Sequence, residues 1–333
     1  ANEWGVLMEK NTLTRLLEQN PALVLEWHTP VGVLEIPVVE LREAATATPV
    51  DFIRLTLQLA DDEEHVLLKG AANGIGAVIR EHPFSVSLIG QQGKGEEQLL
   101  ALRDQSILFS ASTWMDISDP YWTAAVYDPH VGYFRYVPAK LVLPGSIQLR
   151  LATGKHYTLL ENHQSFTDMK EHWAERAVEL LASKLIVQGR GTGRFEPEQP
   201  VTRAELAAML DRMLHPADDQ DTVSFANEGE EWYEAAIRKA SLAGWVQGYE
   251  DGSLRPQAAV SRQEMMVMIA RAIQSVEQGE QVEVTEDGSN AMQGKGLNVL
   301  DYDDIADWAQ ADIARLSLRG LLTGDQENRL YPQ

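Results

Sequence analysis

Residues 166–214 read FTDMKEHWAERAVELLASKLIVQGRGTGRFEPEQPVTRAELAAMLDRML, and the architecture of the C-terminal half of the chain can be predicted from this segment. From Trp173 to about Lys184, apolar residues recur at helical spacing, which predicts an amphipathic helix. Asp168 precedes it as an N-cap or turn residue. The charged residues lie on the opposite side, as expected of a helix that packs by one face.

A loop and a second helix follow. The glycines and the proline of 189–197 predict a loop, because glycine permits positive φ and proline lacks the N–H that a helix interior uses. Thr202 and Glu205 form a Thr-x-x-Glu capping box, which predicts a second helix over 203–213. The box returns further along the chain at Ser261 and Glu264.

The whole order of residues is repeated. When Trp173, Trp232 and Trp308 are aligned, a glycine follows each tryptophan by 16 residues and a proline follows it by 24. The glycines are Gly189, Gly248 and Gly324, and the prolines are Pro197, Pro256 and Pro332. A pair of short helices cannot bury its own apolar face, so we expect the units to pack together.

These units divide the chain into five parts. We predict a module over 1–162, repeats over 163–215, 222–274 and 298–333, and a polar, glycine-containing insertion or linker over 275–297. The third repeat is incomplete, because it lacks its second helix. Since the chain also begins at Ala1 and not at Met, we interpret it as a mature form or an excised segment.

The repeat resembles the S-layer homology domain. The resemblance rests on Phe-x-Asp before His-Trp-Ala at 166–174, on Gly189 with Phe-x-Pro at 195–197, and on Val-Thr-Arg-Ala-Glu at 201–205. It covers about residues 165–333. It implies three repeats about a pseudo-threefold axis, which bind an anionic, often pyruvylated, secondary cell wall polysaccharide in the grooves between them. The second copy departs from the pattern with Asn227 and Glu231, and the third opens with Tyr302-Asp303-Asp304.

The resemblance also implies roles for individual residues. Arg203 and Arg262, at the starts of the second helices, would hold the ligand's acid group bidentately. The tryptophan faces would stack on sugar rings, and the glycines would let backbone approach the glycan. The candidate ligand-binding residues are Arg203, Arg262, Trp173, Trp232, Trp308, Gly189, Gly248, Gly324, Glu205, Glu264 and Asp168. The alternatives are core positions for the tryptophans, capping for the two glutamates and surface ion pairs for the arginines.

Composition restricts the function further. The net charge of -22 disfavours nucleic acid as a partner, and the absence of cysteine excludes disulfides and thiolate chemistry. No apolar run approaches the length of a membrane helix. The acidic run at 61–65 is interpreted as a solvated turn or helix start and not as a metal cluster. We expect no cofactor and no metal.

Residues 1–162 indicate a β-rich module. Alternating and β-branched segments predict strands at 23–28, 33–39, 52–59 and 84–89 and several more up to 160, with a short helix at 11–19. The glycine-rich stretch 70–76, with Tyr136 and Lys140, resembles short-chain dehydrogenases. We reject that activity, because Pro138 lies between the two residues, which should share a helix face.

The predicted fold class is multidomain α and β, a β-rich module followed by all-α helix-loop-helix repeats. The predicted function is non-catalytic anchoring of a surface protein to the wall of a Gram-positive-type bacterium by binding the secondary cell wall polymer. Two alternatives remain, namely the anchoring end of a larger extracellular glycoside hydrolase and a self-assembling S-layer lattice subunit. Self-association is therefore a further option, whereas membrane insertion is not expected.

Overall fold

The computed structural model describes residues 2–93, 95, 97–102, 107–112, 119–129, 132–143, 146–191, 193–214, 232–279, 299–322 and 324–332. They form two compact units, of which the first ends at Pro197 and the second begins at Glu198. The first unit therefore includes the first helix and the loop of the first predicted repeat. The predicted limits of the module and the repeats stay predictions, because compact units need not coincide with sequence repeats.

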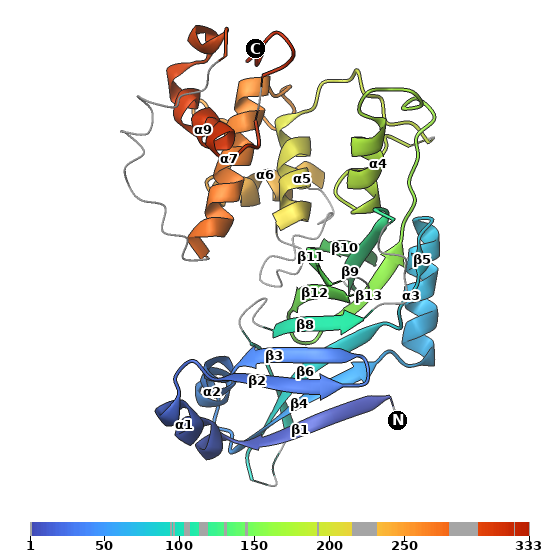
Figure 1. Cartoon of the computed structure of the whole chain (residues 1–333), viewed down its shortest axis with the longest axis vertical. Coiled ribbons are helices and arrows are strands. Elements are labelled where there is room, and N and C mark those ends of the chain that lie inside the picture. The colour runs from blue at the N-terminus through green and yellow to red at the C-terminus, as the bar shows by residue number, and fades with distance from the viewer. Residues whose placement is uncertain are drawn as a thin grey trace. The chain divides into compact units, whose positions relative to one another are not determined.

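The first unit contains two antiparallel β-sheets (Figure 1). The larger sheet has eight strands. Its main path runs through β1 (Glu3–Glu9), β4 (Phe52–Leu59), β6 (Phe84–Gln91), β13 (His156–Glu161), β9 (Trp122–Asp128) and β10 (Tyr133–Val137), with β5 (Val78–Ile79) beside β13 and β7 (Glu97–Leu100) beside β6. The smaller sheet has five strands, in the order β11 (Ala139–Leu143), β12 (Ser146–Leu151), β8 (Ile107–Ser112), β3 (Gly32–Pro37) and β2 (Val24–Thr29).

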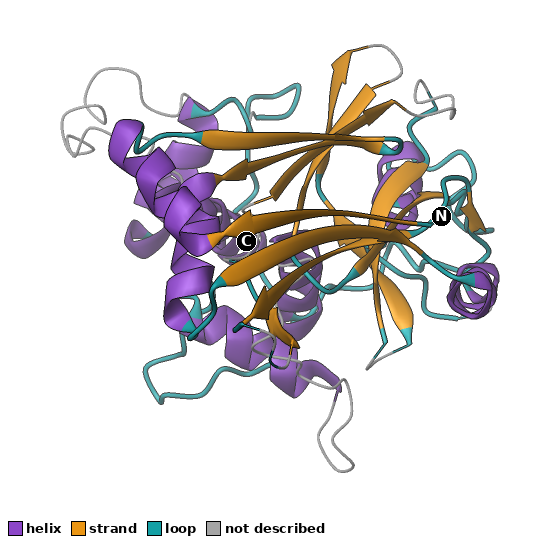
Figure 2. Ribbon diagram, turned by 90° about the horizontal axis from the view of Figure 1, so that it is seen from below, coloured by secondary structure: helices purple, strands orange, loops and turns teal. Residues whose placement is uncertain are grey.

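One hydrophobic core joins the two sheets. Leu34 of β3 and Phe109 of β8 lie in the same buried cluster as Leu55 of β4. Residues of α1 (Lys10–Gln19) and α2 (Val38–Ala47) complete this cluster. The strands run as long extended ribbons in Figure 2, and the predicted β-rich N-terminal region is confirmed.

α3 (Asp62–Gly74) covers the opposite face of the larger sheet. Ala124 and Val126 of β9 face the core between the sheets, whereas Ala125 and Tyr127 face a second cluster with α3. β9 is therefore buried on both faces, which explains why its sequence is continuously apolar and does not alternate.

The helices of the first unit agree only partly with the sequence predictions. The short helix predicted at 11–19 is confirmed as α1. The strand predicted over 33–39 ends at Pro37, because α2 begins at Val38. The acidic run at 61–65 begins α3, and a hydrogen bond of 2.9 Å from the amide of Glu64 to the Asp61 carboxylate caps this helix.

α4 (Glu175–Ser183), the first helix of the repeats, belongs to the first unit. The side-chain amide of Asn162 donates to the carbonyl of Ser183 at 2.9 Å. Lys184 donates to the carbonyl of Trp122, and its ammonium lies 4.5 Å from the centre of that indole. Leu185 packs against the cluster under α3. The end of α4 is therefore bound to the larger sheet.

The second unit is helical in the residues that the structure describes. It contains α5 (Arg203–Leu214), α6 (Trp232–Leu242), α7 (Arg262–Gly279), η1 (Tyr302–Asp304) and α9 (Asp307–Leu318). The helix predicted over 203–213 is confirmed as α5. Residues 275–279 of the predicted insertion continue α7, and its remaining residues lie outside the described part. Among the described helices, none is long and apolar enough to cross a membrane.

Largely buried ion pairs connect the helices of successive repeats. Asp211 of α5 pairs with Lys239 of α6 at 2.9 Å, and Arg271 of α7 pairs with Asp312 of α9 at 3.0 Å. Trp245, which is fully buried, belongs to the cluster between α5, α6 and α7. Within the second unit the helices of successive repeats therefore pack against one another, as the amphipathic pattern predicted.

Candidate functional site

The three repeats share one loop conformation. In each, the amide of the residue that follows the repeat's glycine donates to the carbonyl oxygen four residues later. The bonds join Arg190 to Arg194 at 3.0 Å, Tyr249 to Ser253 at 2.9 Å and Asp325 to Arg329 at 3.0 Å. The repeat found in the sequence is thus also a repeat of backbone geometry.

Each loop has left-handed backbone at the same two positions. The first is occupied by Gly193, Gly252 and Asn328, which are residue types that tolerate this conformation. The second is occupied by Glu196, Arg255 and Tyr331, with φ of 64°, 43° and 50°. Such backbone costs about 1–3 kcal/mol for a residue with a side chain, so all three loops store strain at one position.

A carboxylate holds the strained position in the first and third loops. Asp168 accepts hydrogen bonds from the amides of Phe195 and Glu196 at 2.9 and 2.8 Å. The amide of Phe195 contributes most to lowering the pKa of Asp168. The role of Asp168 as a ligand residue stays a prediction, and its carboxylate already binds two backbone amides of the loop.

Asp301 does the same in the third repeat, where it accepts from the amides of Leu330 and Tyr331. Burial alone would raise the pKa of Asp301, but these amides outweigh it and hold the pKa below its usual value. The third repeat therefore opens at Asp301, and not at Tyr302-Asp303-Asp304 as the alignment by tryptophan suggested. Asn227 and Glu231 of the second repeat lie outside the described residues.

The repeat glycines lie against their own loops. A Cβ atom on Gly189 would lie 2.6 Å from the carbonyl oxygen of Arg194 and 2.7 Å from the ring of Phe166. On Gly324 it would lie 2.8 Å from the side chain of Asn328, whereas on Gly248 its nearest neighbour would be 3.3 Å away. The crowding of the loop therefore accounts for glycine at 189 and 324 without a ligand.

Both predicted capping boxes are confirmed. The carboxylate of Glu205 accepts from the amide of Thr202 at 2.8 Å, and the Thr202 hydroxyl accepts from the amide of Glu205 at 3.2 Å. Ser261 and Glu264 make the same pair of bonds at 2.8 and 3.3 Å. The start of each of these helices is also hydrogen-bonded to the loop of the next repeat. The amide of Ala204 donates to the carbonyl of Pro256, and the amide of Gln263 donates to the carbonyl of Pro332.

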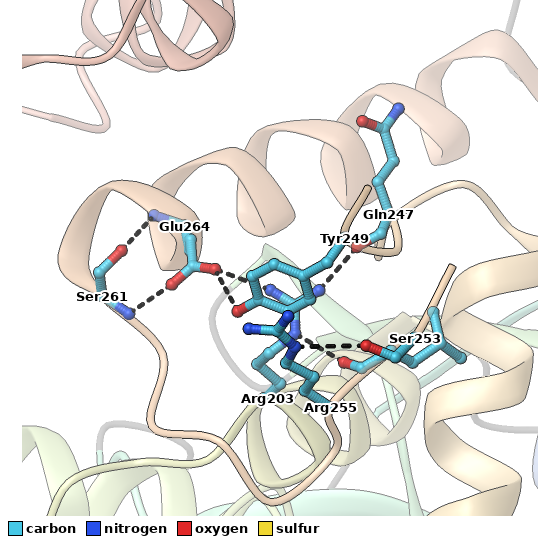
Figure 3. Close-up of polar contacts among 8 residues, drawn as sticks. Arg203, Gln247, Tyr249, Ser253, Arg255, Ser261 and Glu264 are labelled. Atoms are coloured by element: carbon cyan, nitrogen blue, oxygen red, sulfur yellow. Dashed lines mark hydrogen bonds and ion pairs between the residues drawn. The ribbon is translucent and has the colours of Figure 1, made fainter. Parts of the chain in front are cut away.

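Arg203 is the centre of a polar cluster between the first two repeats (Figure 3). Its guanidinium donates to the carbonyls of Leu254 and Gln247, at 3.0 and 2.7 Å, and to the Glu264 carboxylate at 3.0 Å. Arg203 is only 4 % exposed. The structure therefore gives this arginine an internal ion pair, where the sequence favoured ligand contact and left a surface pair as the alternative.

Tyr249 and Arg255 extend this cluster to the surface. The guanidinium carbons of Arg203 and Arg255 lie 4.9 and 4.0 Å from the centre of the Tyr249 ring. The Tyr249 hydroxyl donates to the Glu264 carboxylate at 3.1 Å. Sequence reasoning missed both residues. Their signal was positional, since Tyr249 follows a repeat glycine and Arg255 precedes a repeat proline.

Glu264 is held ionised by this environment. Burial alone would raise its pKa, but the amide and hydroxyl of Ser261, the Tyr249 hydroxyl and the Arg203 charge outweigh it and lower the pKa. Glu264 thus caps α7 and pairs with the repeat before it.

Arg262 begins α7 as Arg203 begins α5, but it is exposed. Arg203 of the first repeat pairs with Glu264 of the second, so the corresponding partner of Arg262 would be a glutamate on the second helix of a third repeat. Among the described residues the two candidate arginines are therefore in different environments, Arg203 buried and Arg262 exposed.

The candidate tryptophans are exposed where the structure describes them. Trp173 precedes α4 and is 91 % exposed, and Trp308, the second residue of α9, is 54 % exposed. The side chain of Trp232 lies outside the described residues. Trp245, which the alignment did not use, occupies the core instead.

Comparison with known proteins agrees with the geometry. Residues 165–207 and 227–266 match the S-layer homology domain. The chain is 30 % identical over 220 residues to an amylopullulanase of Thermoanaerobacterium thermosulfurigenes, over 65 % of this chain and 11 % of that protein. It is 27 % identical over 165 residues to the S-layer protein sap of Bacillus anthracis, over 49 % of this chain and 19 % of that protein.

A third relative is a cellulosome-anchoring protein of Acetivibrio thermocellus, 30 % identical over 117 residues, which are 33 % of this chain and 26 % of that protein. The chain thus spans about a quarter or less of the length of each of these relatives.

Proposed function

The chain carries S-layer homology repeats, and on that premise we propose that its C-terminal half attaches it to the cell wall by binding an anionic secondary cell wall polysaccharide. It is an extracellular, wall-associated protein, since its repeats and its S-layer relatives are of that kind. S-layer homology repeats are an anchoring module and not a catalytic one. The enzyme names among the relatives belong to much larger proteins, of which this chain covers a small part.

The exposure of Trp173 carries the proposal. A tryptophan side chain is among the largest sources of burial energy in a protein, yet this one contributes nothing to the core of its unit. An indole held in water can stack on the C–H face of a sugar ring. Trp308 supports the same role in the third repeat.

Arg262 supplies the second element, a guanidinium that can hold a carboxylate bidentately at the positive end of the α7 dipole. A pyruvylated sugar would present such a carboxylate. We assign Arg203 a structural role in this proposal, because its donors are already engaged with Glu264 and two carbonyls.

The proposal includes a pseudo-threefold arrangement of the repeats. The loop of the second repeat bonds to the start of α5, and the loop of the third bonds to the start of α7, each through the carbonyl of the repeat proline. A constant step from one repeat to the next supports a rotational array with a groove at each step.

Co-sedimentation with purified wall sacculi tests the proposal, before and after acid extraction of the non-peptidoglycan polymer. Binding is expected only to unextracted walls, and Trp173→Ala and Arg262→Ala are each expected to weaken it. Arg238→Ala is the matched control, because Arg238 is also an exposed arginine of the repeats but lies within α6 and not at a helix start. Equal pelleting with extracted and unextracted walls would contradict the proposal.

A lattice subunit is the second candidate, favoured by the S-layer proteins among the relatives. Electron microscopy of the purified chain on wall fragments separates the two, since ordered arrays are expected only of a lattice subunit.

A further inference from the structure

We propose that Arg255, and not Arg203, is the arginine that reads the polysaccharide's acid group at the junction of the first two repeats. This inference rests on the proposed function and adds a specificity-determining residue to it. The ligand class is a sugar that carries a carboxylate.

The positive charge that is exposed at this junction belongs to Arg255 and not to Arg203. Arg203 is buried and its guanidinium is committed to three internal acceptors, so a ligand could reach it only by displacing Glu264. Arg255 stacks on the same tyrosine ring, with its guanidinium carbon 4.0 Å from the ring centre and its side chain 50 % exposed. The cluster therefore presents a cation to solvent through Arg255.

Only some of the N–H donors of the Arg255 guanidinium are already hydrogen-bonded. Its Nε donates to the Ser253 hydroxyl at 3.2 Å and its Nη2 to the Asp251 carboxylate at 2.9 Å. Within the described part of the chain, its Nη1 has no acceptor, although a guanidinium offers five N–H donors. A ligand carboxylate can therefore accept from Nη1 while Nη2 stays paired with Asp251.

Contacts with three residues fix the orientation of this guanidinium. Stacking on Tyr249, the bond to Ser253 and the pair with Asp251 hold it in one place, which reduces the ordering that a ligand must impose. Its backbone has φ of 43°, which is strained for a side-chain-bearing residue.

The three repeats carry different residues at the position of Arg255. The position of Arg255 is occupied by Glu196 in the first repeat and by Tyr331 in the third, with the same left-handed backbone. A glutamate would repel a carboxylate and a tyrosine would offer one hydroxyl. The strained position therefore gives each loop a different preference, and only the second loop carries a cation there.

The test uses the full chain and unextracted wall sacculi as the probe, with thermal unfolding measured on the same samples. Arg255→Gly is expected to weaken binding about 10-fold or more, as for one lost hydrogen bond to a charged group. Its melting temperature is expected to stay equal or rise, because glycine accepts the backbone conformation. A purely structural role for the side chain predicts lower stability instead.

Two further variants sharpen the test. Arg255→Lys is expected to lose most of the binding although it keeps the charge, since it lacks the planar guanidinium. Glu196→Gly is the matched control, which relieves the same strain without removing a cation and should bind as the wild type does. Wild-type binding with undiminished binding by Arg255→Gly would overturn this inference alone. Absence of wild-type binding to unextracted walls would overturn the proposed function together with it.

Discussion

Replacing Arg203 with methionine is expected to lower the free energy of unfolding of the second unit by about 3–5 kcal/mol, the usual cost of breaking a buried pair from one side. Methionine fills much of the same volume, so the loss comes from the groups it leaves behind. These are the carbonyls of Leu254 and Gln247 and the carboxylate of Glu264. Glu264 keeps the bonds from Ser261 and Tyr249, which keeps the cost within this range.

Urea unfolding followed by the helical circular dichroism signal measures the effect. With a slope of about 2 kcal/mol per molar urea, the midpoint is expected to fall by roughly 1.5–2.5 M. Arg262→Met is the matched control, because Arg262 starts the next second helix but is exposed, and surface changes usually cost less than about 0.5 kcal/mol.

A double-mutant cycle with Glu264→Gln isolates the pair. The two residues are in direct contact, so the double variant is expected to be more stable than the sum of the single losses predicts. If Arg203→Met shifted the midpoint no further than Arg262→Met, or if the two losses simply added, the internal role assigned to Arg203 would be refuted.

Three further outcomes follow from the loops and from the end of α4. Gly189→Ala is expected to cost about 1–3 kcal/mol through overpacking against Arg194 and Phe166, and Gly248→Ala much less, so equal melting temperatures would contradict the crowding explanation. Leu185, with φ of 61°, follows the C-terminus of α4, and Leu185→Gly is expected to unfold at a higher temperature than Leu185→Ala, because both lose the packing but only glycine relieves the backbone. The reverse order would show that strain is unimportant there. Burial lowers the pKa of Lys184 to about 8 from an unfolded value of 10.5, so the unfolded chain binds more protons between these values and stability is expected to rise with pH across them. Lys184→Met removes this contribution, and denaturation of both proteins at pH 8 and pH 10 should show a steeper rise for the wild type.

Much of the repeat could be predicted because its signals are local. The capping boxes of Thr202 and Ser261 act across three residues, and helical spacing acts across one or two turns. The N-terminal module was predicted only as β-rich. Its division into two sheets, with β9 buried on both faces, arises from strand pairings between distant segments.

The candidate site was harder to predict than the fold. Trp173, on which the alignment was built, is 91 % exposed, whereas Trp245, which it did not use, is fully buried. Helical periodicity places neither of them, because Trp173 precedes α4 and Trp245 follows α6. The opening of the third repeat at Asp301 was likewise visible only from the amides that its carboxylate holds.

Repeated helix-loop-helix units of the S-layer homology type could be predicted from the sequence alone, since glycine, proline and capping residues act on adjacent backbone. Which arginine is internal and which is available depends on how the repeats pack against one another. Arg203 is buried because the second repeat brings Glu264 and two carbonyls to it from 44 to 61 residues away. Arg255 is held at the surface by Tyr249 on the same cluster. Contacts over such separations depend on how the repeats pack, and the order of residues within one repeat does not contain them.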